Sequence, residues 1–381
     1  MIRYLRPSAI RRRRVLLRVD FNVPIRRGRA ADEFDIVRVL PTVRALVAGR
    51  NTCILLSHHS DPHQSLRPLL PRLSRHLGRP VAFLAQPLLS AARRRVAIAR
   101  PGTVFLAENV RFWPGEQANS VPFARALARL GDVFVNEAFG ECHRPYASII
   151  GIPRFLLSYA GPLLRAEMRM LDRFRFRPRR PFLGVLGGAK VSTKLPLLRR
   201  FLRRADGVLV GGAMANVLLR ARGISVGRSR VDGGFPGLGA LARSPRLLLP
   251  LDARVIKVGK RPHGRRTVLI TGVASDEAIA DIGPLTGRIF RDAIARARTV
   301  IWNGPLGRVE ERPYAAGTRS LARSLLRPGL AVLIGGGDTV ASLNRMRLLS
   351  RFKHISTGGG ALLAYLAGEK LPGLEALKRR R

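Results

Sequence analysis

One device recurs four times in the second half of the chain: an apolar strand-like run, a glycine turn and a helix-like segment. It occurs at 182–194, 207–219, 331–343 and 354–366. Runs that are apolar throughout are typical of parallel strands buried on both faces, and the helix returns the chain to the edge where the next strand starts. Four such units predict one open α/β sheet that binds ligands at the carboxyl ends of its strands.

The first half of the chain also alternates between strand-like and helix-like segments. An amphipathic stretch from Ile36 to Leu46 separates VLLRV (15–19) from CILLS (53–57). Further strand-like runs follow at 81–84, 103–109 and 132–138, with a helix-like stretch near 122–130. This alternation predicts βαβ units, so the fold class is α/β with two doubly wound, Rossmann-like parallel-sheet domains.

The link between the two domains is predicted from a helix and a basic stretch. The chain has 381 residues, more than one hydrophobic core usually serves. Residues 160–176 have a helical pattern and lead into RPRRP (177–181) before a new strand starts. We therefore expect a first domain over 1–159, a hinge helix over 160–176 and a second domain over 177–364.

The composition favours anionic partners. Lys and Arg number 69 against 24 Asp and Glu, a formal net charge of +45. Phosphorylated metabolites, nucleotides, nucleic acid and acidic lipid all fit such a charge, which does not choose among them. Two cysteines make no disulfide framework, and the sequence has neither a long apolar span nor a signal peptide, so a cytoplasmic protein without membrane contact is expected.

Two of the glycine turns carry charged residues suited to phosphate chemistry. Neither of the standard phosphate-binding fingerprints is present, yet glycines at helix starts let backbone N–H groups approach a phosphate closely. Asp338 follows one glycine run, where it either caps the helix or holds Mg²⁺ on a nucleotide. Lys190 and Lys194 follow another, four residues apart and predicted one above the other on a helix. A chain with only seven lysines places two here, and a compact ammonium suits a transferring phosphoryl group.

Nine short motifs occur along almost the whole chain in a characteristic order. They are RVDFNVP (18–24), LPT (40–42), LLSH (55–58), ENVRF (108–112), AFG followed by HR (138–144), GGAKVSTK (187–194), WNGPLG (302–307), GGGDT (335–339) and STGGGA (356–361). In this order the set resembles phosphoglycerate kinase.

The resemblance implies phosphoryl transfer between 1,3-bisphosphoglycerate and ADP with Mg²⁺, giving 3-phosphoglycerate and ATP in glycolysis or carbon fixation. The first domain would hold the glycerate, with the tail 365–381 packed back on it, and the second the nucleotide. The two domains would close about the hinge helix and keep water from the acyl phosphate. The family's usual state is a monomer.

The resemblance also assigns roles by position. Acid-substrate residues would be Asp20, Phe21, Asn22, His58, Arg111 and Arg144. Nucleotide-binding residues would be Lys194, Glu310, Gly336, Gly337, Asp338 and Thr339. Lys190 matches the lysine on the transferring phosphoryl group, and Asp338 matches the carboxylate linked to the metal.

Two positions depart from the family's pattern. Counting back from LPT places the family's catalytic arginine on Asp35, and the glycine-arginine-proline expected after LLSH is Ser60, Asp61 and Pro62. Each departure replaces a cation by an anion. Arg38 lies one helical turn beyond Asp35 and is our candidate for the catalytic arginine. The alternative function is a pseudoenzyme of this fold that binds nucleotide or RNA without transferring phosphate.

Overall fold

The chain forms two compact units. The computed structural model describes residues 1–26, 29–30, 33–233, 235–259 and 263–378. Unit 1 comprises Met1–Arg169 with Lys370–Arg381, and unit 2 comprises Met170–Glu369. The boundary falls inside helix α6 (Pro162–Phe176), and the end of the chain groups with unit 1 from residue 370 onward.

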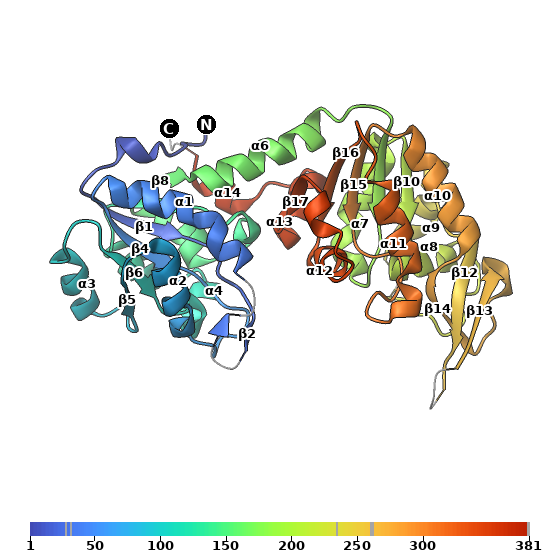
Figure 1. Cartoon of the computed structure of the whole chain (residues 1–381), viewed down its shortest axis with the longest axis horizontal. Helices are drawn as coiled ribbons and strands as arrows, with labels where there is room; N and C mark the ends of the chain where they lie inside the picture. The colour runs from blue at the N-terminus through green and yellow to red at the C-terminus, as the bar shows by residue number, and fades with distance from the viewer. Residues whose placement is uncertain (27–28, 31–32, 234, 260–262, 379–381) are drawn as a thin grey trace. The chain divides into compact units, whose positions relative to one another are not determined.

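Unit 1 is built on a six-stranded parallel sheet in the order β5-β6-β4-β1-β7-β8 (Figure 1). The strands are β1 (Arg14–Arg18), β4 (Thr52–Leu56), β5 (Val81–Leu84), β6 (Val104–Ala107), β7 (Val133–Asn136) and β8 (Leu157–Ala160). A short hairpin, β2 (Ile25–Arg26) and β3 (Arg29–Ala30), follows β1. The strands predicted in the first half of the chain are confirmed to within two residues at their ends.

Helices surround the sheet of unit 1 (Figure 1). They are α1 (Phe34–Ala48), α2 (Leu70–Leu77), α3 (Ser90–Ala97), α4 (Pro114–Gln117), α5 (Val121–Ala128) and α14 (Pro372–Ala376). Because side chains alternate along a strand, Val15 and Leu17 of β1 face one side and pack in one core with Val39 and Val43 of α1. The predicted amphipathic helix is thereby confirmed, with its apolar stripe against the sheet.

Unit 2 contains a second six-stranded parallel sheet, in the order β11-β10-β9-β15-β16-β17. Its strands are β9 (Phe182–Leu186), β10 (Gly207–Val210), β11 (Leu247–Leu248), β15 (Thr299–Asn303), β16 (Ala331–Gly335) and β17 (His354–Ser356). The helices are α7 (Val191–Arg204), α8 (Gly212–Ala221), α9 (Leu238–Ala242), α10 (Pro284–Arg296), α11 (Ala316–Ser324), α12 (Gly337–Arg345) and α13 (Gly359–Ala367). All four strand-turn-helix devices belong to this one sheet, as predicted.

A three-stranded antiparallel sheet also lies in unit 2 and was not predicted. It has the order β13-β12-β14, formed by β12 (Asp252–Lys257), β13 (His263–Leu269) and β14 (Glu277–Ile282). One face buries Ile256, Ala278 and Ala280 against Tyr314. No α-helix directly follows β12 or β13, and β14 pairs antiparallel with β12 although Gly283 and α10 follow it, so the repeated device does not reveal this sheet.

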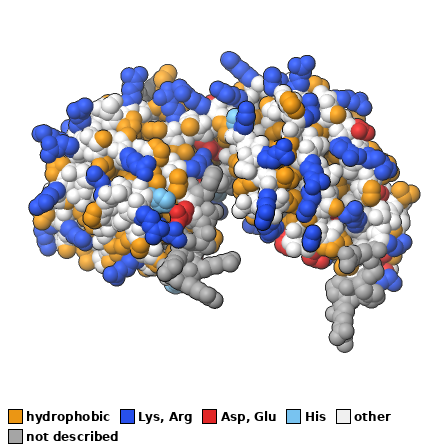
Figure 2. All heavy atoms as spheres, viewed as in Figure 1, with side chains coloured by type: hydrophobic (Ala, Val, Ile, Leu, Met, Phe, Trp, Pro, Cys, Tyr) orange, Lys and Arg blue, Asp and Glu red, His pale blue; other side chains and the backbone are white. Residues whose placement is uncertain are grey.

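Positive side chains are spread over the surface. On the face in Figure 2, Lys and Arg side chains are scattered across both units among neutral and apolar atoms. This view therefore singles out no one basic patch as a nucleic-acid surface. Among the described residues, no helix has the length and apolar character needed to cross a membrane.

Candidate functional site

The predicted acid-substrate residues follow four neighbouring strands of unit 1 at their carboxyl ends. Asp20, Phe21 and Asn22 come after β1, His58 after β4, and Arg144 after β7. Arg111 follows β6, the strand beyond β4, in the single-turn helix η3 (Val110–Phe112). Parallel strands end at one edge of the sheet, so the topology brings together residues that are far apart in sequence.

A buried arginine sets the protonation of His58. Arg18 is fully buried in β1, and its Nη2 lies 3.2 Å from His58 Nδ1. A guanidinium only donates hydrogen bonds, so Nδ1 accepts and the ring proton resides on Nε2. His58 is 1% exposed, and burial, reinforced by the nearby Arg18 and Arg111, holds its pKa well below the usual value. His58 is therefore a neutral donor through Nε2.

Polar groups that the sequence did not indicate stabilise the charge of Arg18. Its Nε donates to Ser148 Oγ at 2.9 Å. Ser148 in turn donates to Glu116, from its backbone N at 2.8 Å and from its Oγ at 2.5 Å. Burial raises the pKa of Glu116, against the lowering effect of Arg18 and Ser148. The three residues come from β1, α4 and the turn at Ala147–Gly151, so only the fold brings them together.

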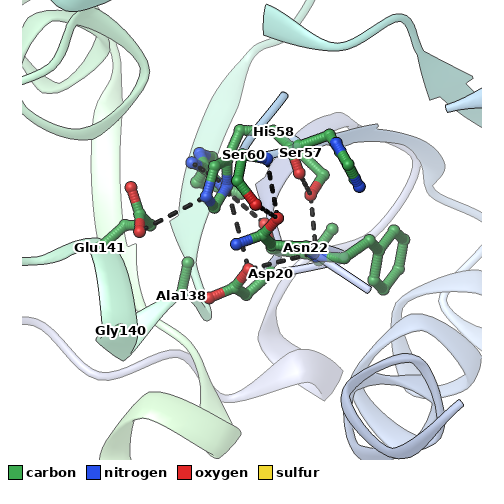
Figure 3. A network of polar contacts seen from close by, with 12 residues as sticks. Asp20, Asn22, Ser57, His58, Ser60, Ala138, Gly140 and Glu141 are labelled. Carbon is green, nitrogen blue, oxygen red and sulfur yellow. Dashed lines mark hydrogen bonds and ion pairs between the residues drawn. The ribbon is translucent and has the colours of Figure 1, made fainter. Parts of the chain in front are cut away.

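The loop after β1 is tied to the loop after β4 (Figure 3). Asn22 Oδ1 accepts hydrogen bonds from Ser60 N at 2.8 Å and from Ser60 Oγ at 2.6 Å. Phe21 is buried, and its backbone N donates to Ser57 Oγ at 2.8 Å. Phe21 thus anchors the loop, while Asn22 is exposed at the site.

Asp20 lies among other acidic groups. Burial, followed by the carboxylates of Glu141 and Asp35, raises its pKa to about 6 against the lowering effect of Arg18. Asp35 lies in the first turn of α1, where the helix dipole favours an anion. It is also near enough to Asp20 to influence it electrostatically.

Glu141 is the functional residue that sequence reasoning missed. It ends the single-turn helix η4 (Phe139–Glu141), and Figure 3 shows its carboxylate turned toward His58. Its Oε1 lies 3.4 Å from His58 Nε2, and its Oε2 lies 3.3 Å from Arg111 Nη2. One sequence feature could have indicated Glu141: it is an acidic residue between AFG and HR, in a chain with few acidic residues.

The other residues considered for binding the acid substrate either pair with other groups or are exposed. Arg38 Nη2 pairs with Glu167 Oε2 of α6 at 3.1 Å. The carboxylate of Asp61 accepts a hydrogen bond from His63 N at 2.9 Å within its own turn. Arg144 is exposed and near enough to His58 to lower the pKa of that ring.

The predicted nucleotide residues of unit 2 also lie at strand ends. The turn after β9 touches the turn after β15 so closely that a Cβ on Gly187 would meet Pro305 O at 2.1 Å. Gly336, after β16, has φ +92, which favours glycine, and a Cβ there would lie 2.8 Å from Asn303 Nδ2. Asn303 Nδ2 is buried without a hydrogen-bond partner among the described residues, a second functional candidate that we did not predict.

The two lysines occupy different environments. Lys194 lies in α7, is 6% exposed and donates from Nζ to Gly187 O at 2.7 Å. Burial lowers its pKa to about 8, although Asp338 acts in the opposite direction. Lys190 is exposed at the cap position before α7, with φ −85 and ψ 81. The prediction that both lysines stack on the helix is wrong, because the helix starts only at Val191.

The turn after β16 presents its residues as a helix start. Asp338 is exposed in the first turn of α12, which begins at Gly337. Thr339 is buried, and its Oγ1 accepts a hydrogen bond from Gly304 N at 2.7 Å. Glu310 is exposed in the turns after β15.

The donor set suits Mg²⁺ bound together with phosphates. Asp338 offers one exposed carboxylate, and the described residues contain no cluster of three or more His, Cys, Asp or Glu that could hold a metal alone. Mg²⁺ commonly binds through one or two carboxylates together with substrate phosphates and water. The residues therefore fit a metal that arrives with a nucleotide.

Comparison with known proteins assigns the chain to a family. The sequence profile of phosphoglycerate kinase matches residues 5–369. The phosphoglycerate kinase of Pelotomaculum thermopropionicum is 42% identical over 386 residues, covering 98% of each chain. The chain belongs to the phosphoglycerate kinase family.

Solved phosphoglycerate kinases share the fold. The enzyme of Coxiella burnetii matches with a TM-score of 0.83 and 35% identity, over 96% of each chain. That of Pyrococcus horikoshii matches with a TM-score of 0.85 and 28% identity, over 99% of this chain and 98% of its own. The chain is thus an enzyme that transfers a phosphoryl group reversibly between 1,3-bisphosphoglycerate and ADP. No comparison supports the pseudoenzyme alternative.

Proposed function

We propose that unit 1 binds 3-phosphoglycerate at the carboxyl edge of its sheet and that unit 2 binds ATP with Mg²⁺ at the corresponding edge. The observation that carries this proposal is that each set of residues lies after neighbouring parallel strands of one sheet. Phosphoryl transfer asks a protein mainly for positioning and for positive charge around the transferring group.

On the acid side, the site supplies donors to an anion. Arg144 is exposed at the site, and His58 offers Nε2–H as a neutral donor. Arg111 has a buried Nε without a hydrogen-bond partner among the described residues. These three would hold the phosphate and carboxylate groups of 3-phosphoglycerate, with Asp20 and Asn22 near them.

On the nucleotide side, helix starts and lysines supply the positive charge. The first turn of α12 points backbone N–H groups toward the ligand, and the Gly336 turn admits phosphate close to the backbone. Asp338 would hold Mg²⁺, which neutralises charge on the phosphates. Lys190, exposed at the start of α7, would follow the phosphoryl group as it transfers.

Arg144→Ala tests the acid-side assignment by steady-state kinetics. We expect the KM for 3-phosphoglycerate to rise about 10–100-fold, because a hydrogen bond between charged groups is lost, while the KM for ATP stays unchanged. Arg154→Ala removes an exposed arginine elsewhere in unit 1 and is the matched control. An equal rise in both KM values, or none, would contradict the assignment.

The pKa of Lys194 predicts how ATP binding depends on pH. A pKa lowered to about 8 means that the ammonium is charged below pH 8 and neutral above it. We therefore expect the KM for ATP to rise as the pH increases from 7 to 9.5, with a midpoint near 8. Lys194→Arg keeps its charge and should flatten this profile. A wild-type profile that is already flat would show that Lys194 does not contact the nucleotide.

A further inference from the structure

Glu141 places a carboxylate inside the group of cations assigned to 3-phosphoglycerate. Its side chain is only 12% exposed and lies between Arg111 Nη2 at 3.3 Å and His58 Nε2 at 3.4 Å. A negative charge of the protein thus lies beside His58 (Figure 3) and beside Arg111, two residues that follow neighbouring strands of one sheet.

The contacts of Glu141 are long and leave donors unsatisfied. His58 Nε2 and Arg111 Nε are buried and have no hydrogen-bond partner among the described residues. Native proteins satisfy nearly all buried polar atoms, so two such donors beside one carboxylate indicate a place for an additional acceptor. Glu33 shows the contrast, since it pairs with Arg72 and approaches His76 Nε2 at 2.7 Å.

The charges around the site are nearly balanced. Arg18, Arg111 and Arg144 all act on His58, whereas Glu141 and Asp35 both act on Asp20. The arginines of this site therefore share it with several carboxylates of the protein, Glu116 beside Arg18 among them. A substrate with a phosphate and a carboxylate meets less positive potential here than the arginines alone would provide.

We propose that Glu141 determines the affinity for 3-phosphoglycerate as an internal counter-anion that occupies Arg111 and His58 until the substrate displaces it. This inference rests on the proposed function of unit 1. An anionic oxygen of the substrate would take the unsatisfied donors of both residues, and the carboxylate of Glu141 would give up its two contacts. Part of the substrate's binding free energy is spent on that exchange.

Glu141→Gln tests the proposal, because it keeps the shape of the side chain and removes its charge. Titration calorimetry with 3-phosphoglycerate should show a Kd about 10-fold lower than in the wild type. The Kd for ATP should not change. Steady-state kinetics should show a lower KM for 3-phosphoglycerate with kcat retained, whereas a purely structural role would leave KM unimproved.

Glu33→Gln is the matched control, since Glu33 also joins an arginine and a histidine in unit 1. It should leave both Kd values unchanged. Glu141→Ala serves as a second variant if the glutamine variant does not fold. Circular dichroism tests whether each variant is folded.

The outcomes separate this inference from the function on which it rests. Tighter binding in Glu141→Gln, including binding that appears only in the variant, supports the proposal. Wild-type binding with an equal or weaker affinity in the variant overturns the role of Glu141 and leaves the function of unit 1 intact. ATP binding by both proteins without any binding of 3-phosphoglycerate overturns both.

Discussion

Replacing Lys190 by alanine is expected to lower kcat about 10²–10³-fold while leaving the KM values for both substrates within a few-fold of the wild type. A group that stabilises charge only as it develops in the transition state contributes to kcat and little to ground-state binding. Lys190 is exposed at the start of α7, beside the turn that contains Gly187 and Gly188. Lys190 is therefore accessible to the substrates, whereas Lys194 is buried.

Stopped-flow or coupled measurement of ADP formation from ATP and 3-phosphoglycerate gives both parameters. Lys190→Arg should recover only part of the rate, because a planar guanidinium does not replace a compact ammonium. Lys353→Ala changes another lysine of unit 2 and is the control for net charge. Unchanged kcat in Lys190→Ala would remove Lys190 from the reaction.

Arg18→Met is expected to lower the free energy of unfolding by about 3–5 kcal/mol, the range found when one partner of a buried charge network is removed. The guanidinium is fully buried and hydrogen-bonded to Ser148 Oγ and His58 Nδ1. Without it, Glu116 keeps its contacts to Ser148 but loses the cation that lowers its pKa. A buried carboxylate is then left without a nearby compensating cation.

Urea unfolding followed by circular dichroism measures this effect. Arg14→Met is the matched control on the same strand: its ion pair with Asp132 is about one third exposed, so its loss should cost less than about 1 kcal/mol. Adding Glu116→Gln to Arg18→Met should recover part of the stability, because the two charges are coupled. A loss below 1 kcal/mol for Arg18→Met would contradict the network.

The two sheets were predictable because their signals are local. Each strand of the repeated device is marked by its own apolar run, and each turn by its own glycines, so residues close in sequence suffice. No local marker predicts the antiparallel sheet of β12, β13 and β14: Gly283 and α10 follow β14 as they would follow a parallel strand, yet β14 pairs antiparallel with β12. Lys190 was wrongly predicted to lie on the helix for a related reason: the sequence pattern does not define the first residue of a helix.

The order of the motifs also indicated which residues gather at the sheet edges, because the topology of a parallel sheet places all strand ends together. It did not indicate what lies between them. Glu141 lies beside His58 and Arg111, which are 83 and 30 residues away in the sequence. Arg18 donates to Ser148, 130 residues away, and Ser148 donates to Glu116, 32 residues away. Periodicity and composition carry no information on such distances.

The amino-acid sequence alone determined the fold class, the family resemblance and the residues that would handle phosphate, because these follow from local patterns and their order. Only the tertiary structure decided the protonation of His58, the burial of Lys194 and the position of Glu141 among the arginines. Those properties depend on distances of a few ångströms and on exclusion of water, which arise when distant segments pack together.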